Sequence, residues 1–408
     1  MSAITAKASR KMKKYAVLTR EPRCFLGSFD FSWEQRKLSE IADKVTEKNA
    51  GLQYVETFTN SAEFGIISQR DFFDHDIAKL GSLDGYYIVK NEDFVYNPRI
   101  STSAPVGPIN RNKLGRTGVM SPLYTVFRPH DIDTTYLEYF FKCGYWHSFM
   151  NFNGDSGARS DRFSIRDNVF FQMPIPIPDI DEQRKIGELL TCLDNLITLH
   201  QRKFEKLTNV KKSMLEKMFP QNGSSYPEIR FKGFTDPWEQ RKVQDVADRF
   251  DNLRIPVAAN LRVHGTTPYY GANGIQDYVE GFTHDGEFVL VAEDGANDLK
   301  NYPVKCVNGR IWVNNHAHVL QGKAGISDNS FLAFAISQSD IESLLVGGSR
   351  AKLNAETLMS IEFKLPCLQE QYRIGEYLTQ LDNLITLHQR ELEKLQNIKK
   401  SMLEKMFV

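Results

Sequence analysis

The sequence carries one long segment twice, almost unchanged. Residues 182–219 read EQRKIGELLTCLDNLITLHQRKFEKLTNVKKSMLEKMF, and residues 370–407 read EQYRIGEYLTQLDNLITLHQRELEKLQNIKKSMLEKMF. About 30 of the ~38 aligned positions are identical, which indicates an internal duplication of one structural unit. A shorter pair precedes it, because WEQRKLSEIADK begins at Trp33 and WEQRKVQDVADR begins at Trp238. The chain therefore contains two units whose repeated parts follow the same order.

The stretches between the repeated motifs do not align with one another. A chain of 408 residues is long enough for two domains that each bury a core. This contrast is expected when the repeated segments contact identical partners and the variable stretches between them contact different targets. The predicted boundaries are an N-terminal extension at 1–32, a first variable domain at 33–179, a first helix at 180–220, a linker at 221–237, a second variable domain at 238–366 and a second helix at 367–408.

The repeated segments have the spacing of long paired helices. From Leu190 onward, most residues at alternating steps of three and four are apolar, a heptad seam that favours packing against another helix. Pro220 follows the first segment, where a helix is expected to end. At 1.5 Å per residue each helix would extend ~50–55 Å, longer than a domain needs for its own packing. The predicted interface residues are Leu193, Ile197, Phe204, Leu207 and Met214 in the first copy and Leu381, Ile385, Leu392, Leu395 and Met402 in the second.

Polar residues interrupt this seam at matching places, His200 and Lys211 in the first copy and His388 and Lys399 in the second. Because the same strip closes both halves, the helices are predicted to form an antiparallel coiled coil about a pseudo-twofold axis. The polar residues would then fix its register at some cost in stability. Two alternatives stay open. Each helix could belong only to its own domain, or the histidines could bind a metal, although no carboxylate or cysteine accompanies them at ligand spacing.

Both variable domains have the pattern of α+β structure. Short strand-like runs such as YYIV and LYTVF alternate with turn signals, and helix candidates occur at TTYLEYFFKCGYW and NSFLAFAISQ. RIWVNNHAHVL is strand-like as a whole, which would point His316 and His318 to one face of a strand. Each domain ends in a proline-containing exit strand, QMPIPIP or FKLP, directly before its helix. The predicted architecture is therefore two α+β globules, each leading into a long helix.

The composition is that of a soluble globular protein, with 41% hydrophobic and 25% charged residues and no apolar run near the ~20 residues of a membrane helix. Residues 1–32 are basic but lack a continuous apolar core, which indicates an unstructured start or an extension before Met12 rather than a secretion signal. Five scattered cysteines without a C-x-x-C pair favour a reducing cytoplasm. The formal charge of zero argues against DNA binding by this chain without local basic patches or partner subunits.

Several loop-like stretches combine arginine, lysine, asparagine and serine with glycine. These side chains contact phosphates and base edges in DNA complexes, and glycine permits close approach of the backbone. Solvated loops of the same composition are also common. The candidate DNA-binding residues are Arg99, Ser101, Ser103, Arg159 and Arg162 in the first variable domain, and Tyr270, Asn273, Asn315, Arg350 and Lys352 in the second.

Motifs of catalytic sites are missing from the sequence. There is no Gly-x-Gly-x-x-Gly dinucleotide fingerprint, no phosphate-binding loop followed by Lys-Ser/Thr, and no Gly-x-Ser-x-Gly elbow. Asn97-Pro98 matches only the start of the Asn-Pro-Pro-aromatic motif of amino-methyltransferases, because Arg99 follows. We therefore expect no catalytic residue, metal ion or cofactor in this chain.

The framing motifs carry a family resemblance over nearly the whole chain. Each half opens with W-E-Q-R-K and closes with P-x-x-x-E-Q, here PDIDEQRKIG and PCLQEQYRIG, before a helix that ends in K-S-M-L-E-K-M-F. In this combination the chain resembles the specificity subunit of a Type I restriction-modification system. The first-domain stretches YNPRIS, GVMSPLYTVF and SGARSD are also similar to those of the family.

The resemblance implies that the variable domains are target recognition domains, each reading one half of a bipartite, asymmetric DNA sequence. It implies that the helices set the gap between the half-sites and dock the partner subunits. Those partners would be two modification subunits, which use S-adenosylmethionine to methylate adenine at N6, and two restriction subunits, which use ATP and Mg²⁺ to translocate and cleave DNA. The chain itself would be non-catalytic. The competing hypothesis is a coiled-coil adaptor that binds proteins without DNA specificity.

Overall fold

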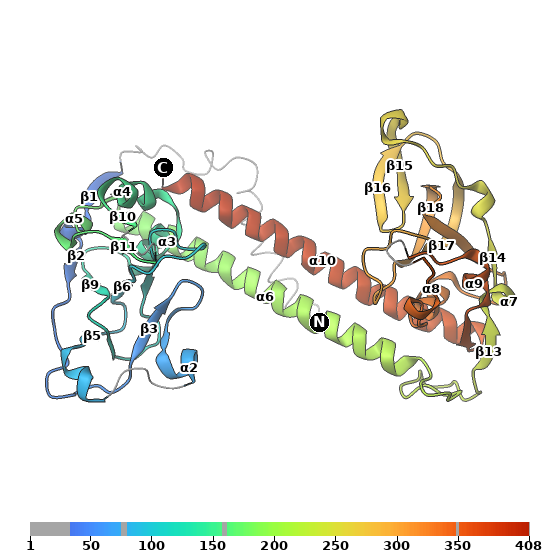
Figure 1. The fold of residues 1–408 in the computed structure, drawn as a ribbon, viewed down its shortest axis with the longest axis horizontal. Coiled ribbons are helices and arrows are strands. Elements are labelled where there is room, and N and C mark those ends of the chain that lie inside the picture. Colours follow the sequence, from blue (N-terminus) through green and yellow to red (C-terminus); the bar gives the residue numbers. More distant parts are fainter. Residues whose placement is uncertain (1–32, 75–79, 157–160, 348–350, 408) are drawn as a thin grey trace. The chain divides into compact units, whose positions relative to one another are not determined.

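The computed structural model describes residues 33–74, 80–156, 161–347 and 351–407, so the predicted N-terminal extension lies outside the described residues. The chain forms two compact units (Figure 1). The first combines Met1–Leu196 with Leu395–Val408, and the second is Ile197–Lys394. The helices α6 (Ile180–Met218) and α10 (Leu368–Met406) each contribute residues to both units. Within the described residues, no helix has the length and apolar character needed to cross a membrane.

The first variable domain is built on several small sheets. A four-stranded antiparallel sheet in the order β2-β9-β6-β7 lies beside three two-stranded sheets, β3-β4, β5-β8 and β10-β11. Their bounds are β2 (Ala42–Lys44), β3 (Phe58–Ser61), β4 (Gly65–Ser68), β5 (Tyr87–Val89), β6 (Phe94–Tyr96), β7 (Ile109–Arg111), β8 (Gly118–Met120), β9 (Thr125–Pro129), β10 (Asp155–Ser156) and β11 (Phe163–Ser164). The helices are α2 (Gln69–Phe73), α3 (Thr134–Lys142), α4 (Tyr145–Asn153) and α5 (Asp167–Phe170).

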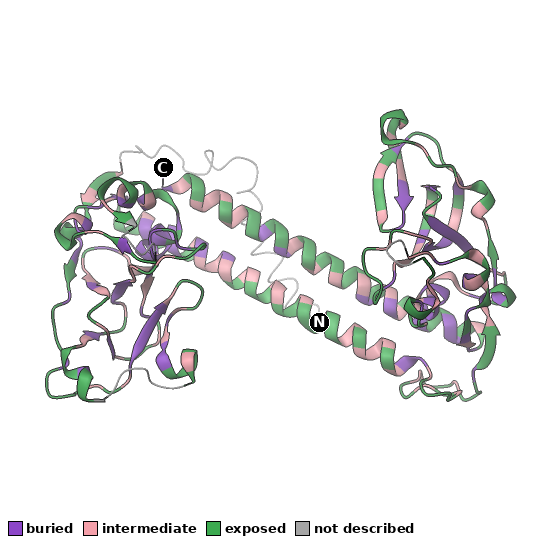
Figure 2. Cartoon of the chain, in the orientation of Figure 1, coloured by how far each residue is buried: buried purple, intermediate pink, exposed green. Residues whose placement is uncertain are grey.

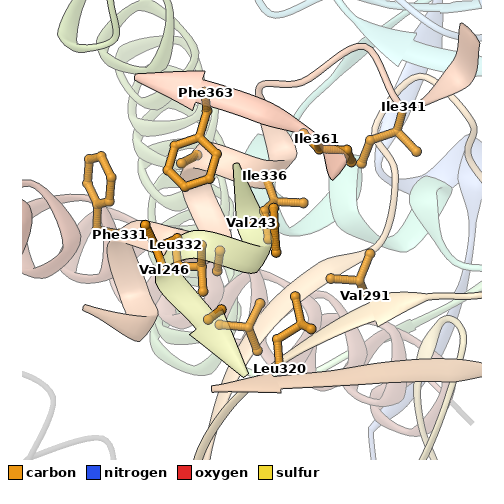
Figure 3. Packing of buried hydrophobic residues seen from close by; sticks show 14 of the residues in the cluster. Val243, Val246, Val291, Leu320, Phe331, Leu332, Ile336, Ile341, Ile361 and Phe363 are labelled. Carbon is orange, nitrogen blue, oxygen red and sulfur yellow. The ribbon is translucent and has the colours of Figure 1, made fainter. Parts of the chain in front are cut away.

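The second variable domain has one larger sheet of six strands, in the order β14-β19-β17-β18-β15-β16. Its strand pairs are antiparallel except β15 with β18, which is parallel. The bounds are β14 (Ala247–Arg249), β15 (His264–Gly271), β16 (Gly274–Val279), β17 (His284–Ala292), β18 (Val304–Val313) and β19 (Ala317–Gly322), with helices α7 (Val243–Val246), α8 (Asn329–Ser337) and α9 (Ala355–Ser360). Valine, leucine, isoleucine and phenylalanine side chains from this sheet and these helices form a common core (Figure 3).

Both domains are closed by the same pair of strands. The repeated Glu-Gln-Arg-Lys forms β1 (Glu34–Lys37), which pairs antiparallel with the exit strand β12 (Pro174–Ile177). Its second copy forms β13 (Glu239–Lys242), which pairs antiparallel with β20 (Glu362–Leu365). The beginning and the end of each variable stretch are therefore held together, and each long helix starts from that closed point.

A buried glutamine attaches each helix to its domain. Gln183 accepts a hydrogen bond from the Asp133 amide at 2.9 Å and donates one to the Pro178 carbonyl at 2.8 Å. Gln371 repeats this arrangement with the Asp328 amide at 3.0 Å and the Pro366 carbonyl at 2.9 Å. The E-Q motif of each half thus satisfies backbone groups that would otherwise be buried without partners.

The aspartates that these glutamines contact are N-caps. Asp133 accepts a hydrogen bond from the Tyr136 amide at the start of α3, and Asp328 accepts one from the Phe331 amide at the start of α8. A glycine in each long helix allows this close approach. A Cβ atom at Gly375 would lie 2.7 Å from the Asp328 carboxylate and 3.0 Å from the Phe331 amide nitrogen.

Each variable domain also packs against the end of the long helix from the other half. Phe407, which follows α10, is 1% exposed, and its ring lies 6.4 Å from Trp33 and 5.5 Å from Tyr136 between centroids. Phe219, which follows α6, lies 5.9 Å from Trp238 and 5.5 Å from Phe331. The final phenylalanine of each K-S-M-L-E-K-M-F segment therefore completes the aromatic core beside the Trp that opens the opposite half.

The helices α6 and α10 pair antiparallel, as the sequence predicted. The Nζ atom of Lys211 lies 2.5 Å from Asp382 Oδ1, and that of Lys399 lies 2.5 Å from Asp194 Oδ1. The two ion pairs are equivalent, because Lys211 and Lys399 are the same position of the repeat, and so are Asp194 and Asp382. The lysines on the seam therefore bind aspartates of the opposite helix, an arrangement that favours a single register.

The predicted interface residues vary in burial along the helices. Leu193, Leu381, Leu392 and Leu395 are buried, and the other six are half-buried: Ile197, Phe204, Leu207, Met214, Ile385 and Met402. Alternating buried and exposed bands follow both helices in Figure 2. The seam is therefore covered unevenly, because Leu392 and Leu395 of α10 are buried whereas the matching Phe204 and Leu207 of α6 are half-buried.

One local prediction was confirmed in part and another was wrong. A helix, α3, does form around TTYLEYFFKCGYW, but it ends at Lys142, and a second helix, α4, begins at Tyr145 after the chain turns at Cys143 and Gly144. RIWVNNHAHVL is not one strand, because a turn separates β18 from β19. His316 lies in that turn and is exposed, whereas His318 is buried within β19, so the two histidines do not share a strand face.

Candidate nucleic-acid interface

Two loops of the first recognition domain that are far apart in the sequence lie side by side. The Ile100 amide donates to the Asp161 carbonyl at 3.1 Å, and the Phe163 amide donates to the Pro98 carbonyl at 2.7 Å. Between these bonds, Arg99 and Arg162 occupy paired positions of an antiparallel bridge, and both side chains are exposed. The structure thus joins two of the predicted DNA-binding residues into one cationic edge.

The predicted serines lie in the same loop. Ser101 and Ser103 are exposed, and their hydroxyl oxygens are 3.2 Å apart. The amide of Ala104 donates to the Ser101 carbonyl at 3.1 Å, which folds the loop into a tight turn. The two hydroxyls therefore belong to residues two and four positions after the exposed Arg99. Arg159, the fifth candidate of this domain, lies outside the described residues.

Polar contacts, of which the one made by Tyr96 is buried, hold the base of this loop. The side chain of Asn97 donates to the Asn60 carbonyl at 2.8 Å and accepts from the Arg99 amide at 2.9 Å. The Tyr96 hydroxyl donates to the Val106 carbonyl at 2.9 Å, and burial raises the pKa of this phenol far above its usual range. Gly107 has a φ of 85°, and a Cβ atom there would lie 2.1 Å from the Asn97 carbonyl oxygen. These contacts present Arg99 from a loop with a defined shape.

A cavity of about 420 Å³ adjoins the paired loops. Its lining includes Pro98 and Arg162 from the loops, together with Lys44, Tyr87 and Tyr124. Lys44 forms an ion pair with Asp167, and this hydrogen bond raises the pKa of the lysine. The cavity combines cations, aromatic rings and hydroxyl groups, a composition that suits contact with a phosphate or a base.

In the second domain, two of the predicted residues serve packing and loop structure. Tyr270 is 7% exposed and packs among the apolar side chains of the sheet, and burial raises the pKa of its hydroxyl. The Asn273 side chain donates to the Gly295 carbonyl at 2.8 Å and accepts from the Asn297 amide at 2.9 Å. Both ends of that amide are thus occupied by the backbone of a neighbouring loop.

The other candidates of the second domain differ in exposure and in whether their side chains already have a partner. Asn315 is exposed in the turn between β18 and β19. The Nζ atom of Lys352 lies 2.8 Å from a Glu293 carboxylate oxygen, an ion pair that raises the pKa of the lysine. Arg350 lies outside the described residues. Asn315 is therefore an exposed candidate. Asn273 is exposed as well and the Lys352 side chain is 44% exposed, but both already have partners.

The structure gathers charged residues around His318 that sequence reasoning did not connect. The Nδ1 atom of His318 lies 2.7 Å from Asp251 Oδ2 and 3.7 Å from Glu293 Oε2. Burial alone would raise the pKa of Asp251, but His318, the Val319 amide and Arg254 lower it below its usual value. These residues come from segments far apart in the chain, so no local spacing could have indicated the cluster.

Basic side chains already bind the carboxylates of this cluster. Arg254 Nη1 lies 2.6 Å from Glu293 Oε2, and Lys352 binds the other oxygen of the same carboxylate. Basic side chains, including Arg249 at 3.7 Å from Asp251 Oδ2, therefore hold the carboxylate oxygens that a metal ion would need. The network ties the segment containing Lys352 to the sheet, since His318 Nε2 also lies 2.9 Å from the Leu353 carbonyl oxygen.

A second surface lies on the repeated decapeptide LDNLITLHQR. Three of its leucines are well exposed, with Leu199 at 46%, Leu384 at 43% and Leu387 at 51%. These residues lie outside the predicted heptad seam, so packing between the helices does not explain them. Leu199 and Leu387 are the same position of the two copies. Exposed leucines at matching positions indicate a docking surface for another protein.

Comparison with known proteins identifies the family to which the chain belongs. A model of the family described as "Type I restriction modification DNA specificity domain" matches residues 32–209 and, a second time, residues 235–397. These two matches together span most of the sequence, and the chain belongs to this family. The boundaries of the matches follow the two halves that the internal duplication defines.

Individual relatives are similar over part of their length. A putative type I restriction enzyme specificity subunit of Haemophilus influenzae is 42% identical over 163 residues, which are 40% of this chain and 42% of that protein. The type I restriction enzyme MjaVIII specificity subunit of Methanocaldococcus jannaschii is 22% identical over 270 residues, which are 58% of this chain and 61% of that protein. The chain thus spans between two-fifths and three-fifths of these curated relatives.

A solved structure has the same fold. The S subunit of a Type-I restriction-modification system from M. genitalium matches with a TM-score of 0.65 and 13% identity, covering 94% of this chain and 98% of that one. At this identity the similarity concerns the architecture. Two α+β domains with an antiparallel pair of long helices are therefore a known arrangement in this class of protein.

Proposed function

We propose that this chain is the DNA-specificity subunit of a Type I restriction-modification complex, in which each recognition domain reads one half of a bipartite, asymmetric sequence. The observation that carries the proposal is the contrast between the repeated helices and the two different domains attached to them. Two domains with different sheets are attached to near-identical helices through the same strands, glutamines and phenylalanines. Different reading surfaces on equivalent supports suit a target whose two halves differ.

In the first domain, the edge formed by Arg99 and Arg162 supports contact with DNA. Two exposed guanidinium groups beside two serine hydroxyls can bind phosphates or the acceptors of a guanine. In the second domain, Asn315 is an exposed polar candidate, and a side-chain amide can pair with adenine. Tyr270 and Asn273 are left out of this proposal because their side chains are engaged within the domain.

The partners follow from the repeated surface. Leu199 and Leu387 place the same apolar side chain on two copies of one helix segment, which suits two copies of one modification subunit. Those subunits would bind S-adenosylmethionine and methylate adenine, and two restriction subunits would use ATP and Mg²⁺. Partner subunits would also share the phosphate contacts, which accounts for a chain with a formal charge of zero. The chain itself would be non-catalytic, and the complex would work in the cytoplasm.

The decisive experiment exchanges one recognition domain. The chain is co-expressed with a modification subunit, and N6-methyladenine is mapped across the genome. Replacing residues 33–179 with those of another specificity subunit is expected to change one half of the methylated motif and leave the other half and the gap unchanged. Replacing residues 238–366 is the matched control and is expected to change the other half. A motif that is insensitive to both exchanges would refute the proposal in favour of an adaptor.

A finer test concerns the paired arginines. Arg99→Ala and Arg162→Ala are each expected to weaken binding of the assembled complex to its target by about 1–3 kcal/mol if they contact bases, with relaxed specificity in one half-site. A phosphate contact would instead weaken binding to all sequences and reduce its salt dependence. Lys212→Ala, at an exposed position on α6, is the matched control. Unchanged binding in both arginine variants would exclude this edge from the interface.

A further inference from the structure

Two histidines meet where the long helices cross within the second unit. His200 on α6 and His388 on α10 place their Nδ1 atoms 3.1 Å apart, with ring centroids 5.0 Å apart and ring planes at 66°. They are the same position of the duplicated segment. The duplication therefore supplies both halves of one contact, with two ring nitrogens aimed at each other across the interface.

The separation of the two nitrogens suits a shared metal ion. Zinc–imidazole bonds are ~2.0–2.1 Å long, so two nitrogens on one ion at this separation subtend an angle of about 100°. That angle lies between the ~90° of square or octahedral coordination and the ~109° of tetrahedral coordination. Binding would replace the hydrogen bond that joins the two rings at this distance.

The electrostatic surroundings keep both imidazoles available. Burial, followed by Lys203, lowers the pKa of His200, and Glu391 acts in the opposite direction. Burial, His200 and Lys203 lower the pKa of His388. The lowered pKa values favour the uncharged imidazole, which is the form that binds metals. Lys203 and Glu391 are equivalent positions of the repeat, so the pair has a cation on one side and a carboxylate on the other.

We propose that His200 and His388 bind one divalent transition-metal ion, such as Zn²⁺ or Ni²⁺, through their Nδ1 atoms and so link α6 to α10. Imidazole nitrogen selects these ions over Mg²⁺ and Ca²⁺, which prefer oxygen ligands. Water would complete the coordination, because the histidines are only half-buried. The site would make the stability of the helix pair depend on the ion.

The test is a titration of the full chain without a polyhistidine tag. Calorimetry with ZnCl₂ and with NiCl₂ is expected to show one saturable site per chain and a rise in Tm. His200→Ala and His388→Ala are each expected to weaken this site by at least about tenfold, since outer-shell changes alone cost 10–100-fold. His130→Ala, at a histidine of the first domain, is the matched control and is expected to leave binding unchanged.

The asymmetric neighbours provide a second, independent measurement. Lys203→Glu places a carboxylate on both sides of the pair and is expected to tighten binding, whereas Glu391→Lys is expected to weaken it. The His200→Gln, His388→Gln double variant keeps polar side chains at the crossing, and its circular dichroism shows whether the helices still form. Stoichiometric binding that persists in this folded double variant would overturn the proposal, as would the lack of a saturable site in the parent chain.

Discussion

The two recognition domains attach to their helices in the same way but are built differently. The first has a four-stranded sheet with separate two-stranded sheets, and the second has a single sheet of six strands. Both keep the closing strand pair, the buried glutamine, the helix glycine and the terminal phenylalanine. The comparison teaches that the duplicated residues are those that join a domain to the helix pair. The residues that shape the exposed surface are free to differ.

The attachments are similar without being identical. Glu370 is fully buried and forms a two-pronged ion pair with Arg230 of the linker, with both distances 2.8 Å. Its counterpart Glu182 is half-buried, and no salt bridge joins it to a cation among the described residues. Burial and the nearby Asp179 raise the pKa of Glu182. The second attachment therefore depends on an ion pair, and the described part of the first does not.

The largest expected effect comes from the terminal phenylalanines. Phe407→Ala and Phe219→Ala each remove a buried ring and should lower the free energy of unfolding by about 3–5 kcal/mol. Hydrogen exchange resolved by peptide should show the loss in the first recognition domain for Phe407→Ala and in the second for Phe219→Ala. Exposed Phe152→Ala is the control. Equal loosening of both domains by either variant would contradict this assignment.

Removing the linker arginine should destabilise the second attachment more than the matching change destabilises the first. Arg230→Ala leaves the buried Glu370 carboxylate without its cation and should destabilise the second domain by about 3 kcal/mol. Glu182→Gln at the counterpart should change stability by no more than about 0.5 kcal/mol, because that carboxylate is half-exposed. Urea denaturation followed by circular dichroism measures both. A small effect for Arg230→Ala would mean that the ion pair adds little to the attachment.

The glutamines should behave alike in the two halves. Gln183→Ala and Gln371→Ala each leave buried backbone groups without a partner and should cost about 1–3 kcal/mol. Gln371 also donates to the Ile326 carbonyl at 3.0 Å, so its loss should be the larger of the two. Thermal unfolding of the two variants tests this order, with exposed Gln172→Ala as the control. The reverse order would show that the extra hydrogen bond does not contribute.

The smallest expected effect is a dependence on pH at the helix crossing. Because the folded pKa values of His200 and His388 are lowered, the unfolded chain binds protons more readily than the folded one. The stabilising contribution is complete above the unfolded value of ~6.5 and is lost as the pH falls below it. The His200→Gln, His388→Gln variant should show a flatter stability profile between pH 7 and pH 5. Lys203 and Glu391 remain in both proteins, so a profile as steep as the parent's would assign the slope elsewhere.

Sequence periodicity was sufficient for the helices and their pairing. The heptad spacing and the near-identity of the two copies predicted the antiparallel coiled coil that the ion pairs Lys211–Asp382 and Lys399–Asp194 now confirm. Local sequence patterns predicted the strands within the domains less accurately. RIWVNNHAHVL has the composition of one strand, but tertiary contacts break it at Asn314, Asn315 and His316. A strand pattern of period two does not indicate where a strand turns back on itself.

The candidate interface could be predicted only in part. Loop composition selected Arg99 and Arg162 as separate candidates, and their pairing across the two loops comes from backbone hydrogen bonds between distant segments. Composition also selected Tyr270, whose aromatic ring belongs to the core of the second domain. Side-chain type alone does not distinguish a tyrosine that faces DNA from one that faces a sheet, because burial is a property of the fold.

The sequence by itself determined the two-part organisation, the long helices, their antiparallel pairing and the family. The first three follow from periodicity and from comparison of one half with the other, and the family follows from the resemblance of the framing motifs W-E-Q-R-K and K-S-M-L-E-K-M-F to those of known members. Only the tertiary structure decided which polar groups are exposed, which are held in networks such as Asp251–His318, and which residues meet across the helix pair. The physical reason is that these properties depend on contacts between residues distant in sequence, which no local pattern encodes.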